Sequence, residues 1–397
     1  MAGDQTDAAA QRAAEVRGDP LRVLVISNGN GEDSIGAGLV RRLPNTIACD
    51  AYPMLGAGRA YEGACAIVGP RLFLPSEGLR RRGTLLKDAR TGFGIRATLR
   101  FLRNAARHYE AIVVVGDMVG VIMCWLGGRR VRVYLDVYKS GYANRYSAPE
   151  RFVLRRTCDL VLTRDERLAE QLRDAGISAR FAGNAMMDTL ATGQYDARGR
   201  RRHSKAIAIL PGSRKSIAQN FALQVAALRQ VPGVAEIDLF ATLATGADIA
   251  ELAAASGLAF IDDGEGPDSL GTLAGDGLMI HLATGSLGAV VEACDIVLGQ
   301  AGTANLQAIG LGRPVVSFLA EGARPTRVRR VADMLGESRI TVAPDAVALG
   351  AAVARLLADD ADRARRGAIG RERIGGGGAF AALAEVLAAD AERPRVS

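Results

Sequence analysis

The sequence has few of the residues that build metal and redox sites. It contains three histidines, and its five cysteines are scattered, without a CxxC pair or any other metal-like spacing. A histidine-rich metal centre is therefore not expected. The cysteines are interpreted as small buried hydrophobic residues of a protein kept in a reducing compartment.

Long hydrophobic runs are also missing. The longest apolar stretch, residues 112–126, is interrupted by Gly116 and Asp117 and is too short to span a bilayer. The first residues lack the apolar segment of a secretory signal, and residues 1–19 are expected to form a disordered tail. We therefore expect a cytoplasmic protein that spans no membrane.

Two common nucleotide-binding fingerprints are absent. No GxGxxG motif follows the first expected strand, and no GxxxxGK[ST] loop occurs, so a NAD-dependent oxidoreductase and an ATP hydrolase are disfavoured. The net charge of +7 suggests phosphates or an anionic membrane surface as partners.

What the sequence does contain is a regular alternation of β-forming and helical segments. Short apolar runs such as 21–27 and 205–210 are separated by Ala-, Leu- and Arg-rich stretches with helical spacing. This alternation predicts an α/β fold with parallel sheets covered by helices. The polar segment 192–205 interrupts it midway, which predicts two Rossmann-like domains. The expected organisation is an N-terminal domain over 20–190, a linker over 191–204, a C-terminal domain over 205–370 and a last helix over 371–397 that packs back towards the N-terminal domain.

Two Gly-rich or acidic corners follow strands of the first half. In VISNGNGEDSIGAGL (25–39), small residues allow a ligand to approach the backbone, and Asp33 lies near the start of a helix. In VVVGDMVGV (113–121), Asp117 directly follows a buried strand, where open α/β sheets place their sites. The alternatives are a structural turn for the first corner and a helix cap for Asp117. On the functional interpretation, Asp117 is a general base or orients one.

Two similar corners follow strands of the second half. In ILPGSRKSIAQNF (209–221), Gly212 permits a close approach, Ser213 can bind phosphate oxygens, and Arg214 can bind a pyrophosphate in a bidentate manner. In VLGQAGTANLQAIGLGRPVVSF (297–318), a helix begins at the end of a strand, so its N–H groups can bind the same anion. Gln307, one turn further in, is within reach of ribose hydroxyls. The residues expected at this nucleotide-sugar site are Gly212, Ser213, Arg214, Gln300, Gly302, Thr303, Asn305 and Gln307.

Two further segments are candidates for the acceptor side. YLDVYKSGY (134–142) ends a strand, and its Lys139 and Tyr142 could contact an acceptor or a phosphate, unless the segment is a solvated loop. Residues 79–109 combine many arginines with Leu, Phe and Ile, which is typical of a helix lying on anionic lipid. A solvated Arg-rich helix is the alternative, and nucleic-acid binding is not expected because aromatic residues are sparse.

Taken together, these motifs resemble the GT-B glycosyltransferases, and among them lipid-A-disaccharide synthase and its related proteins. The resemblance covers roughly residues 21–390 and depends on GEDSIGAGL (31–39), GDMVG (116–120), FAGNAMMDTL (181–190), LPGSR (210–214) and AGTANLQA (301–308). It implies two Rossmann-like domains whose parallel sheets face a central cleft.

The resemblance further implies a hexosyltransferase that needs no metal or cofactor. Such an enzyme moves a sugar, of GlcNAc type, from a UDP-sugar on the C-terminal domain to a lipid or lipid-linked acceptor on the N-terminal domain. It would be peripheral at the inner face of the membrane, which it would contact through 79–107. Asp117 matches the acid treated as catalytic, and Asp33, the second candidate for a catalytic base, matches the acid in the first loop. Arg214 matches the diphosphate-binding arginine, and Asn28 and Gly31 join the acceptor side.

One position departs from this family. Gln307 stands where its members usually carry a ribose-binding Glu, and an amide loses the charge-assisted bond, which is worth about 1 kcal/mol more than a neutral one. An active enzyme with altered donor preference or affinity is expected. A UDP-sugar epimerase, for which His281 is the one histidine candidate, and a non-catalytic nucleotide-sugar-binding relative remain as alternatives.

Overall fold

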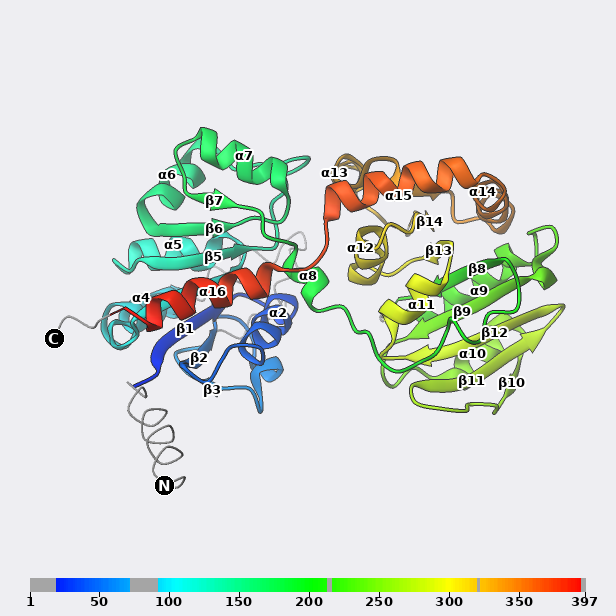
Figure 1. Ribbon diagram of the computed structural model, residues 1–397, viewed down its shortest axis with the longest axis horizontal. Coiled ribbons are helices and arrows are strands. Elements are labelled where there is room, and N and C mark those ends of the chain that lie inside the picture. Colours follow the sequence, from blue (N-terminus) through cyan, green and yellow to red (C-terminus); the bar gives the residue numbers. More distant parts are fainter. Residues whose placement is uncertain (1–18, 72–91, 213–215, 320–321, 394–397) are drawn as a thin grey trace, which may run out of the picture. The chain divides into compact units, whose positions relative to one another are not determined.

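The computed structural model describes residues 19–71, 92–212, 216–319 and 322–393, and it divides into two compact units (Figure 1). The first unit comprises residues up to 141, then 145–188, and the chain from 377 on. The second comprises 142–144 and 189–376. The predicted α/β class with two Rossmann-like sheets is confirmed.

The first unit contains a seven-stranded parallel sheet with the order β3-β2-β1-β4-β5-β6-β7. Its strands are β1 (Leu21–Ser27), β2 (Ile47–Pro53), β3 (Ala66–Ile67), β4 (Ala111–Gly116), β5 (Val131–Asp136), β6 (Cys158–Leu162) and β7 (Ala179–Arg180). All six residues of β4 are buried, as expected for the centre of a sheet that is covered on both faces.

Helices cover both faces of this first sheet, and each face has its own core. One core contains residues of α4 (Gly92–Asn104), α5 (Met118–Leu126), α6 (Ala148–Thr157) and α7 (Glu166–Asp174). The opposite core contains residues of α2 (Asn30–Val40), the 3-10 turn η1 (Arg59–Tyr61) and α16 (Ala379–Ala391). Along β1 the side chains alternate between the two cores, because successive residues of a strand point to opposite faces.

The second unit contains an eight-stranded sheet with the order β10-β11-β12-β9-β8-β13-β14-β15. Its strands are β8 (Lys205–Leu210), β9 (Ile237–Leu243), β10 (Ala259–Ile261), β11 (Ser269–Gly275), β12 (Leu278–Thr284), β13 (Ile296–Gly299), β14 (Val315–Phe318) and β15 (Arg339–Val342). The six neighbouring strands β12-β9-β8-β13-β14-β15 pair in parallel, whereas β10–β11 and β11–β12 pair antiparallel. The antiparallel edge was not predicted from the sequence.

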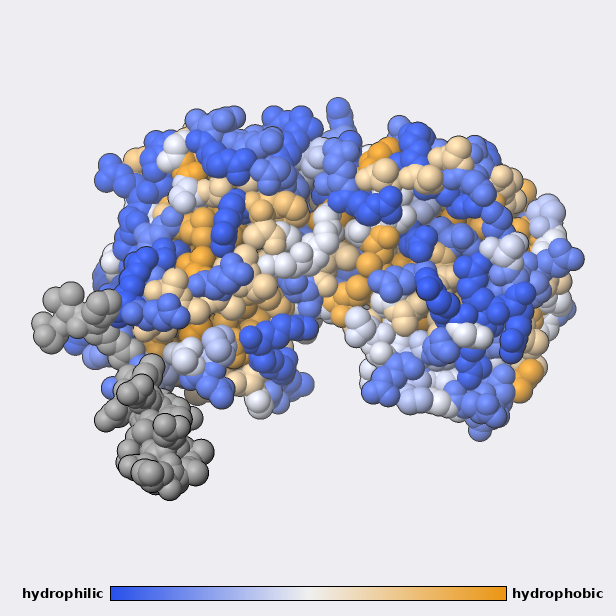
Figure 2. Space-filling model, in the orientation of Figure 1, coloured by the Kyte–Doolittle hydropathy of each residue, from blue (hydrophilic) through white to orange (hydrophobic). Residues whose placement is uncertain are grey.

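Helices α9 (Ile217–Leu228), α10 (Ile249–Ser256) and α14 (Ala346–Ala358) share the main core of this sheet. The remaining helices of the unit are α11 (Leu287–Ala293), α12 (Thr303–Gly310), α13 (Pro325–Leu335) and α15 (Asp360–Ile374). In Figure 2, hydrophilic side chains cover much of the visible face of each unit, and smaller hydrophobic areas are exposed among these side chains.

The segment expected as a linker is bonded closely to the second unit. The backbone N–H of Gln194 donates to Asp268 at 2.7 Å, and that of Tyr195 donates to Ser286 at 3.2 Å. The chain returns to the first unit at residue 377, where Asp188 at the end of α8 (Ala185–Asp188) accepts the N–H groups of Gly378 and Phe380 at 2.6 and 3.0 Å. These two bonds cap the start of α16.

By length and composition alone, residues 360–391 pass for a helix that could cross a membrane, with 33% of the most apolar window buried. The stretch consists of two helices, α15 and α16, separated at residues 375–378. Phe380, Leu383 and Leu387 of α16 belong to a core of the first unit. The apolar face of α16 is therefore occupied by the protein itself.

Candidate functional site

In the first unit, β1 and β4 lie side by side at the point where the strand order reverses. The chain continues from β1 to β2 on one side, whereas β4 leads to β5 on the other. A crevice beyond the carboxyl ends of such strands is the usual ligand site of an open α/β sheet. We call this place the first switch point, and the residues that follow Ser27 and Val115 form it.

Asp33 lies at this point but is closed off from solvent. Its side chain is 1% exposed, and Oδ1 accepts the hydroxyl of Ser27 at 2.6 Å. Ser27 in turn accepts the hydroxyl of Tyr61 at 2.9 Å. Burial raises the pKa of the Asp33 carboxyl, against the hydrogen bond from Ser27. Asp33 therefore stabilises the loop from within, and its proposed catalytic role is not supported by this placement.

Glu32, which the sequence patterns did not single out, approaches the end of β4. Its Oε2 accepts the backbone N–H of Asn28 at 2.9 Å. A Cβ atom on Gly116 would lie 2.3 Å from both Cδ and Oε2 of Glu32, so the carboxyl group lies directly over this glycine. Gly116 has a φ of +126°, a conformation that side chains rarely permit.

The Glu32 carboxyl is the most strongly perturbed acid of this site. Burial, followed by the negative charge of Asp117, raises its pKa from 4.5 to about 8. Hydrogen bonds from the backbones of Asn28 and Asp117 oppose the rise, and the charge of Asp33 adds to it. A carboxyl group with such a pKa changes its protonation near neutral pH, as acid and base catalysts do.

Asp117 is half-buried and forms the N-cap of α5. Its Oδ1 accepts the N–H of Val119 at 2.9 Å and the amide of Asn28 at 3.2 Å. Capping thus accounts for part of its role, and the bond to Asn28 joins the two loops of the first switch point. A Cβ atom on Gly31 would meet nothing within 4 Å, so the space beside α2 is open.

The two other acceptor-side candidates are engaged elsewhere. Lys139 is 8% exposed and pairs with Glu150 at 2.8 Å, and its ammonium lies 5.1 Å from the centre of the Tyr146 ring. This burial and pairing do not support a ligand contact by Lys139 in the structure as it stands. Tyr142 donates to Glu372 of α15 at 3.0 Å and belongs with the second unit.

The second unit has an equivalent switch point, where β8 lies beside β13. At the ends of β8 and β13, buried side-chain amides bond to backbone carbonyl groups. Gln224, 0% exposed, donates Nε2 to the carbonyls of Leu210 and Leu298 at 3.3 and 3.0 Å. Asn305, 2% exposed, donates Nδ2 to the carbonyl of Gly299 at 3.0 Å. Asn305 therefore holds the strand end together and is not a surface ligand.

Gln300 and Gln307 are also held within the protein. The Oε1 atom of Gln300 accepts the hydroxyl of Ser317 at 3.1 Å. Gln307 is 5% exposed and has a partner inside the protein. A ribose contact by Gln307 would therefore require its side chain to move, because helix α12 buries it.

The start of α12 is the open part of this second switch point. Gly302 and Thr303 are exposed, and the N-cap residue Gly302 has no side chain with which to cap the helix. A Cβ atom on Gly302 would meet nothing within 4 Å. Gly212 has a φ of +100°, and a Cβ atom on it would lie 3.7 Å from the carbonyl oxygen of Gln300 and 3.9 Å from Cα of Ala301. Free N–H groups at an uncapped helix start bind phosphate. Ser213 and Arg214 lie outside the described residues.

His281, the histidine considered for an epimerase, lies inside the sheet. Its Nδ1 is 3.0 Å from the hydroxyl of Thr272, and its ring lies 5.6 Å from that of Phe240. Strand β9 separates its strand, β12, from β8. Among the residues that the structure describes, no group of three or more His, Cys, Asp or Glu side chains could hold a metal ion.

No protein-family model matches the sequence, and no curated protein matches it. Solved structures do share its fold. UDP-GlcNAc 2-epimerase from Neisseria meningitidis, bound to UDP-GlcNAc, has a TM-score of 0.55 at 14% identity and covers 93% of this chain and 100% of its own. The glycosyltransferase SnogD from Streptomyces nogalater has a TM-score of 0.51 at 18% identity and covers 94% of this chain and 100% of its own.

A putative UDP-N-acetylglucosamine 2-epimerase from Listeria monocytogenes is similar to the same extent. Its TM-score is 0.52 at 16% identity, and the match covers 95% of this chain and 98% of the other. Identities of this size establish a shared fold, the two-domain GT-B architecture, and say nothing further about the reaction.

Proposed function

We propose that this protein is a metal-independent glycosyltransferase that moves a sugar, of GlcNAc type, from a UDP-sugar to a lipid or lipid-linked acceptor at the cytoplasmic face of the membrane. The observation that carries the proposal is the pair of switch points. The second offers an open, uncapped helix start to a diphosphate, and the first holds a pair of carboxyl groups, Glu32 and Asp117. The motif resemblance to lipid-A-disaccharide synthase supports the choice of reaction.

The division of labour follows from the charges at the two places. Positive N–H dipoles at Gly302 and Thr303 would stabilise the negative charge that develops on the leaving diphosphate. The carboxyl groups of the first switch point suit proton transfer from an acceptor hydroxyl. Neither group requires a cation.

A nucleotide-sugar epimerase is the second candidate, because two of the three structures described above bear that name and share the fold. Product analysis separates the two reactions. A transferase releases UDP only when an acceptor is present, whereas an epimerase interconverts two UDP-sugars without one.

Nucleotide binding is the first property to measure. We expect UDP and one UDP-sugar to raise the melting temperature, since a ligand at about 100 times its Kd stabilises the folded state by ~2.7 kcal/mol. Gly302→Val is expected to abolish the shift, because a side chain would fill the open space in front of α12. The measurement is thermal unfolding against a panel of nucleotides and nucleotide sugars.

Gly31→Val is the matched control, since Gly31 lies in the first turn of a helix and also faces open space, but in the first unit. It should leave the UDP shift intact. Loss of the shift in Gly31→Val alone would place the nucleotide on the first unit. No shift with any uridine compound would contradict the donor assignment.

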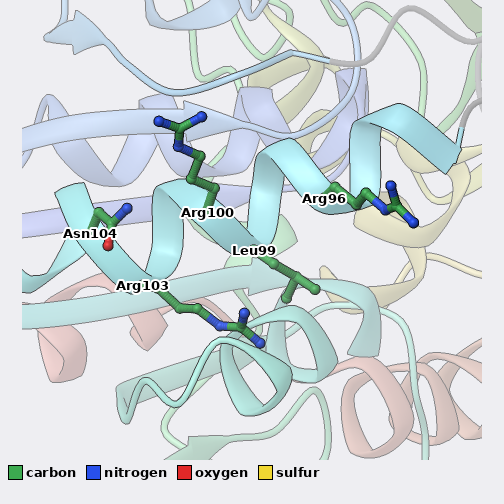
Figure 3. A pocket seen from close by; sticks show the side chains of 5 residues that line it. All are labelled: Arg96, Leu99, Arg100, Arg103 and Asn104. Atoms are coloured by element: carbon green, nitrogen blue, oxygen red, sulfur yellow. The ribbon is translucent and has the colours of Figure 1, made fainter.

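The lipid acceptor is supported by one surface of the first unit. Helix α4 exposes Arg96, Arg100 and Arg103, which point in different directions around a shallow groove that Leu99 and Asn104 also line (Figure 3). The guanidinium of Arg103 donates to the carbonyl of Leu126, at the end of α5. The part of the basic stretch from 79 to 91 lies outside the described residues.

Exposed apolar side chains lie on the neighbouring helices α5 and α6. Trp125 and Phe152 are 42% and 49% exposed, and their rings meet edge to face at 6.4 Å. The guanidinium of Arg156 lies 5.4 Å from the centre of the Phe152 ring. Aromatic side chains with arginines around them are typical of surfaces that dock on anionic lipid.

We expect the protein to sediment with vesicles that contain an anionic phospholipid and not with neutral ones. Reversing the charge of Arg96, Arg100 and Arg103 to Glu should weaken binding about a hundredfold or more, as ~1 kcal/mol is lost for each basic residue. The control is the same reversal at three exposed arginines of the second unit: Arg198, Arg355 and Arg371. Equal binding of both triple variants would refute the docking surface.

A further inference from the structure

The carboxyl group of Glu32 lies in the space that a side chain at position 116, the last residue of β4, would fill. Any side chain on Gly116 would overlap this carboxyl, since its Cβ would lie 2.3 Å from Oε2 and 2.7 Å from Oε1. Real Cβ atoms do not approach other atoms this closely. The position of Glu32 therefore depends on a glycine eighty-four residues away in the sequence.

Backbone groups of both loops orient the Glu32 side chain. The N–H of Asn28 donates to Oε2 at 2.9 Å, and the backbone of Asp117 supplies a second hydrogen bond. A tie between two loops needs only an acceptor, which a neutral glutamine would provide. A structural hydrogen-bond acceptor does not need to be an acid. An acid buried beside another acid destabilises the fold when it is ionised, because both burial and like charge oppose ionisation.

The titratable groups around Glu32 come from three elements. Asp117 caps α5, Asp33 follows Glu32 on α2, and Tyr61 lies on η1. Helix α8 also packs on α2, but its Asp188 is bonded to the start of α16. Burial, and after it the negative charges of Asp117 and Asp33, raise the pKa of Glu32 to about 8.

We propose that Glu32, and not Asp117 or Asp33, takes the proton from the acceptor hydroxyl during sugar transfer. This inference rests on the proposed function. The acceptor O–H bond breaks and its proton moves to the Glu32 carboxylate, while the acceptor oxygen forms a bond to the anomeric carbon of the sugar. The bond from that carbon to the diphosphate breaks, and its electron pair leaves with UDP.

Asp117 then acts as a positioning residue. Its negative charge raises the affinity of Glu32 for the proton, which makes Glu32 a stronger base than an ordinary carboxylate. Its bond to the side chain of Asn28 fixes the loop whose N–H group orients Glu32. Asp33, enclosed behind Ser27, supports the same loop from inside.

The test is the pH dependence of kcat/KM with the UDP-sugar that stabilises the protein. Wild type should gain about tenfold in kcat/KM per pH unit up to about pH 8 and then level off. Glu32→Gln keeps the length of the side chain and one acceptor oxygen for a backbone N–H, so it should fold, but kcat/KM should fall about 10²–10⁴-fold and lose its rise with pH. Glu32→Asp should keep part of the rise.

Asp117→Asn distinguishes the two acids. Asn remains a good N-cap, so α5 should stay intact. If Asp117 only raises the pKa of Glu32, this variant should keep most of its activity and reach its plateau at a lower pH. Glu170→Gln, an exposed acid of α7, is the control and should behave as wild type.

Each outcome decides the question. If kcat/KM of Glu32→Gln still rises with pH, the inference is overturned. If only Asp117→Asn loses this rise, the proton is taken by Asp117. Turnover that does not depend on Glu32 refutes the inference and leaves the proposed function standing. Absence of turnover with every donor and acceptor refutes the proposed function, and the role of Glu32 with it.

Discussion

Gly116→Ala is expected to lower both the stability of the protein and its turnover. The alanine would have to adopt the backbone φ of +126° that Gly116 has, and strain of this kind costs about 1–3 kcal/mol. The methyl group would also displace the Glu32 carboxyl, which lies 2.3 Å from the Cβ position. If Glu32 carries the proton, turnover should fall about 10²–10⁴-fold, as for removal of the acid itself. Urea unfolding and kcat/KM measure the two effects.

Gly128→Ala separates backbone strain from displacement of Glu32. Gly128 follows α5 in the same unit and has a φ of +68°, but a Cβ atom there would meet nothing within 4 Å. This control should lose about 1 kcal/mol of stability and keep its turnover. Equal turnover in the two variants would contradict the contact between Gly116 and Glu32.

The double variant Glu32→Ala, Gly116→Ala tests the contact without any activity assay. Removing the Glu32 carboxyl makes room for the new methyl group, so the double variant should be more stable than Gly116→Ala alone. Residues in contact show such non-additivity, whereas independent residues add. Additive losses of stability would mean that the two residues do not touch.

Local patterns were sufficient to predict the two α/β units. Short apolar runs rich in β-branched residues, such as 111–116, favour buried strands, and the segments between them carry a clear helical spacing. The antiparallel edge of the second sheet escaped prediction for a local reason. The edge strand β10 is only three residues long and exposed, and β11 contains polar and glycine residues, so neither has the pattern of a buried strand.

The candidate site was predictable only where chain order places a residue at a strand end. Asp117 directly follows β4, and Gly302 follows β13, so the sequence shows both. Glu32 lies in the first turn of α2, where acids are common because they favour the helix dipole. What sets Glu32 apart is its contact with Gly116, and a contact between distant residues leaves no local pattern. The pairing of Lys139 with Glu150 on the next helix left no local pattern for the same reason.

The pH dependence of stability should reveal Glu32 in the folded protein, whatever its reaction. The pKa of Glu32 is about 8 in the folded protein, against 4.5 for a glutamate that is free of such surroundings, as in an unfolded chain. Between these values the folded protein binds the proton and the unfolded chain does not, so the free energy of unfolding should fall as the pH rises from about 4.5 to 8. At ~1.36 kcal/mol per unit, the fall through this one group is at most on the order of 5 kcal/mol.

Glu32→Gln removes this dependence, so the variant should be the more stable protein at about pH 8.5 and nearly equal to wild type near pH 4.5. Urea unfolding at about pH 4.5, 6.5 and 8.5 measures the difference, with Glu170→Gln as the control. Asp33 and Asp136, whose pKa values burial also raises, are present in all three proteins and cancel in the comparison. Parallel stability profiles for wild type and Glu32→Gln would mean that Glu32 ionises normally. Glu32 would then be no better suited to proton transfer than an exposed carboxylate.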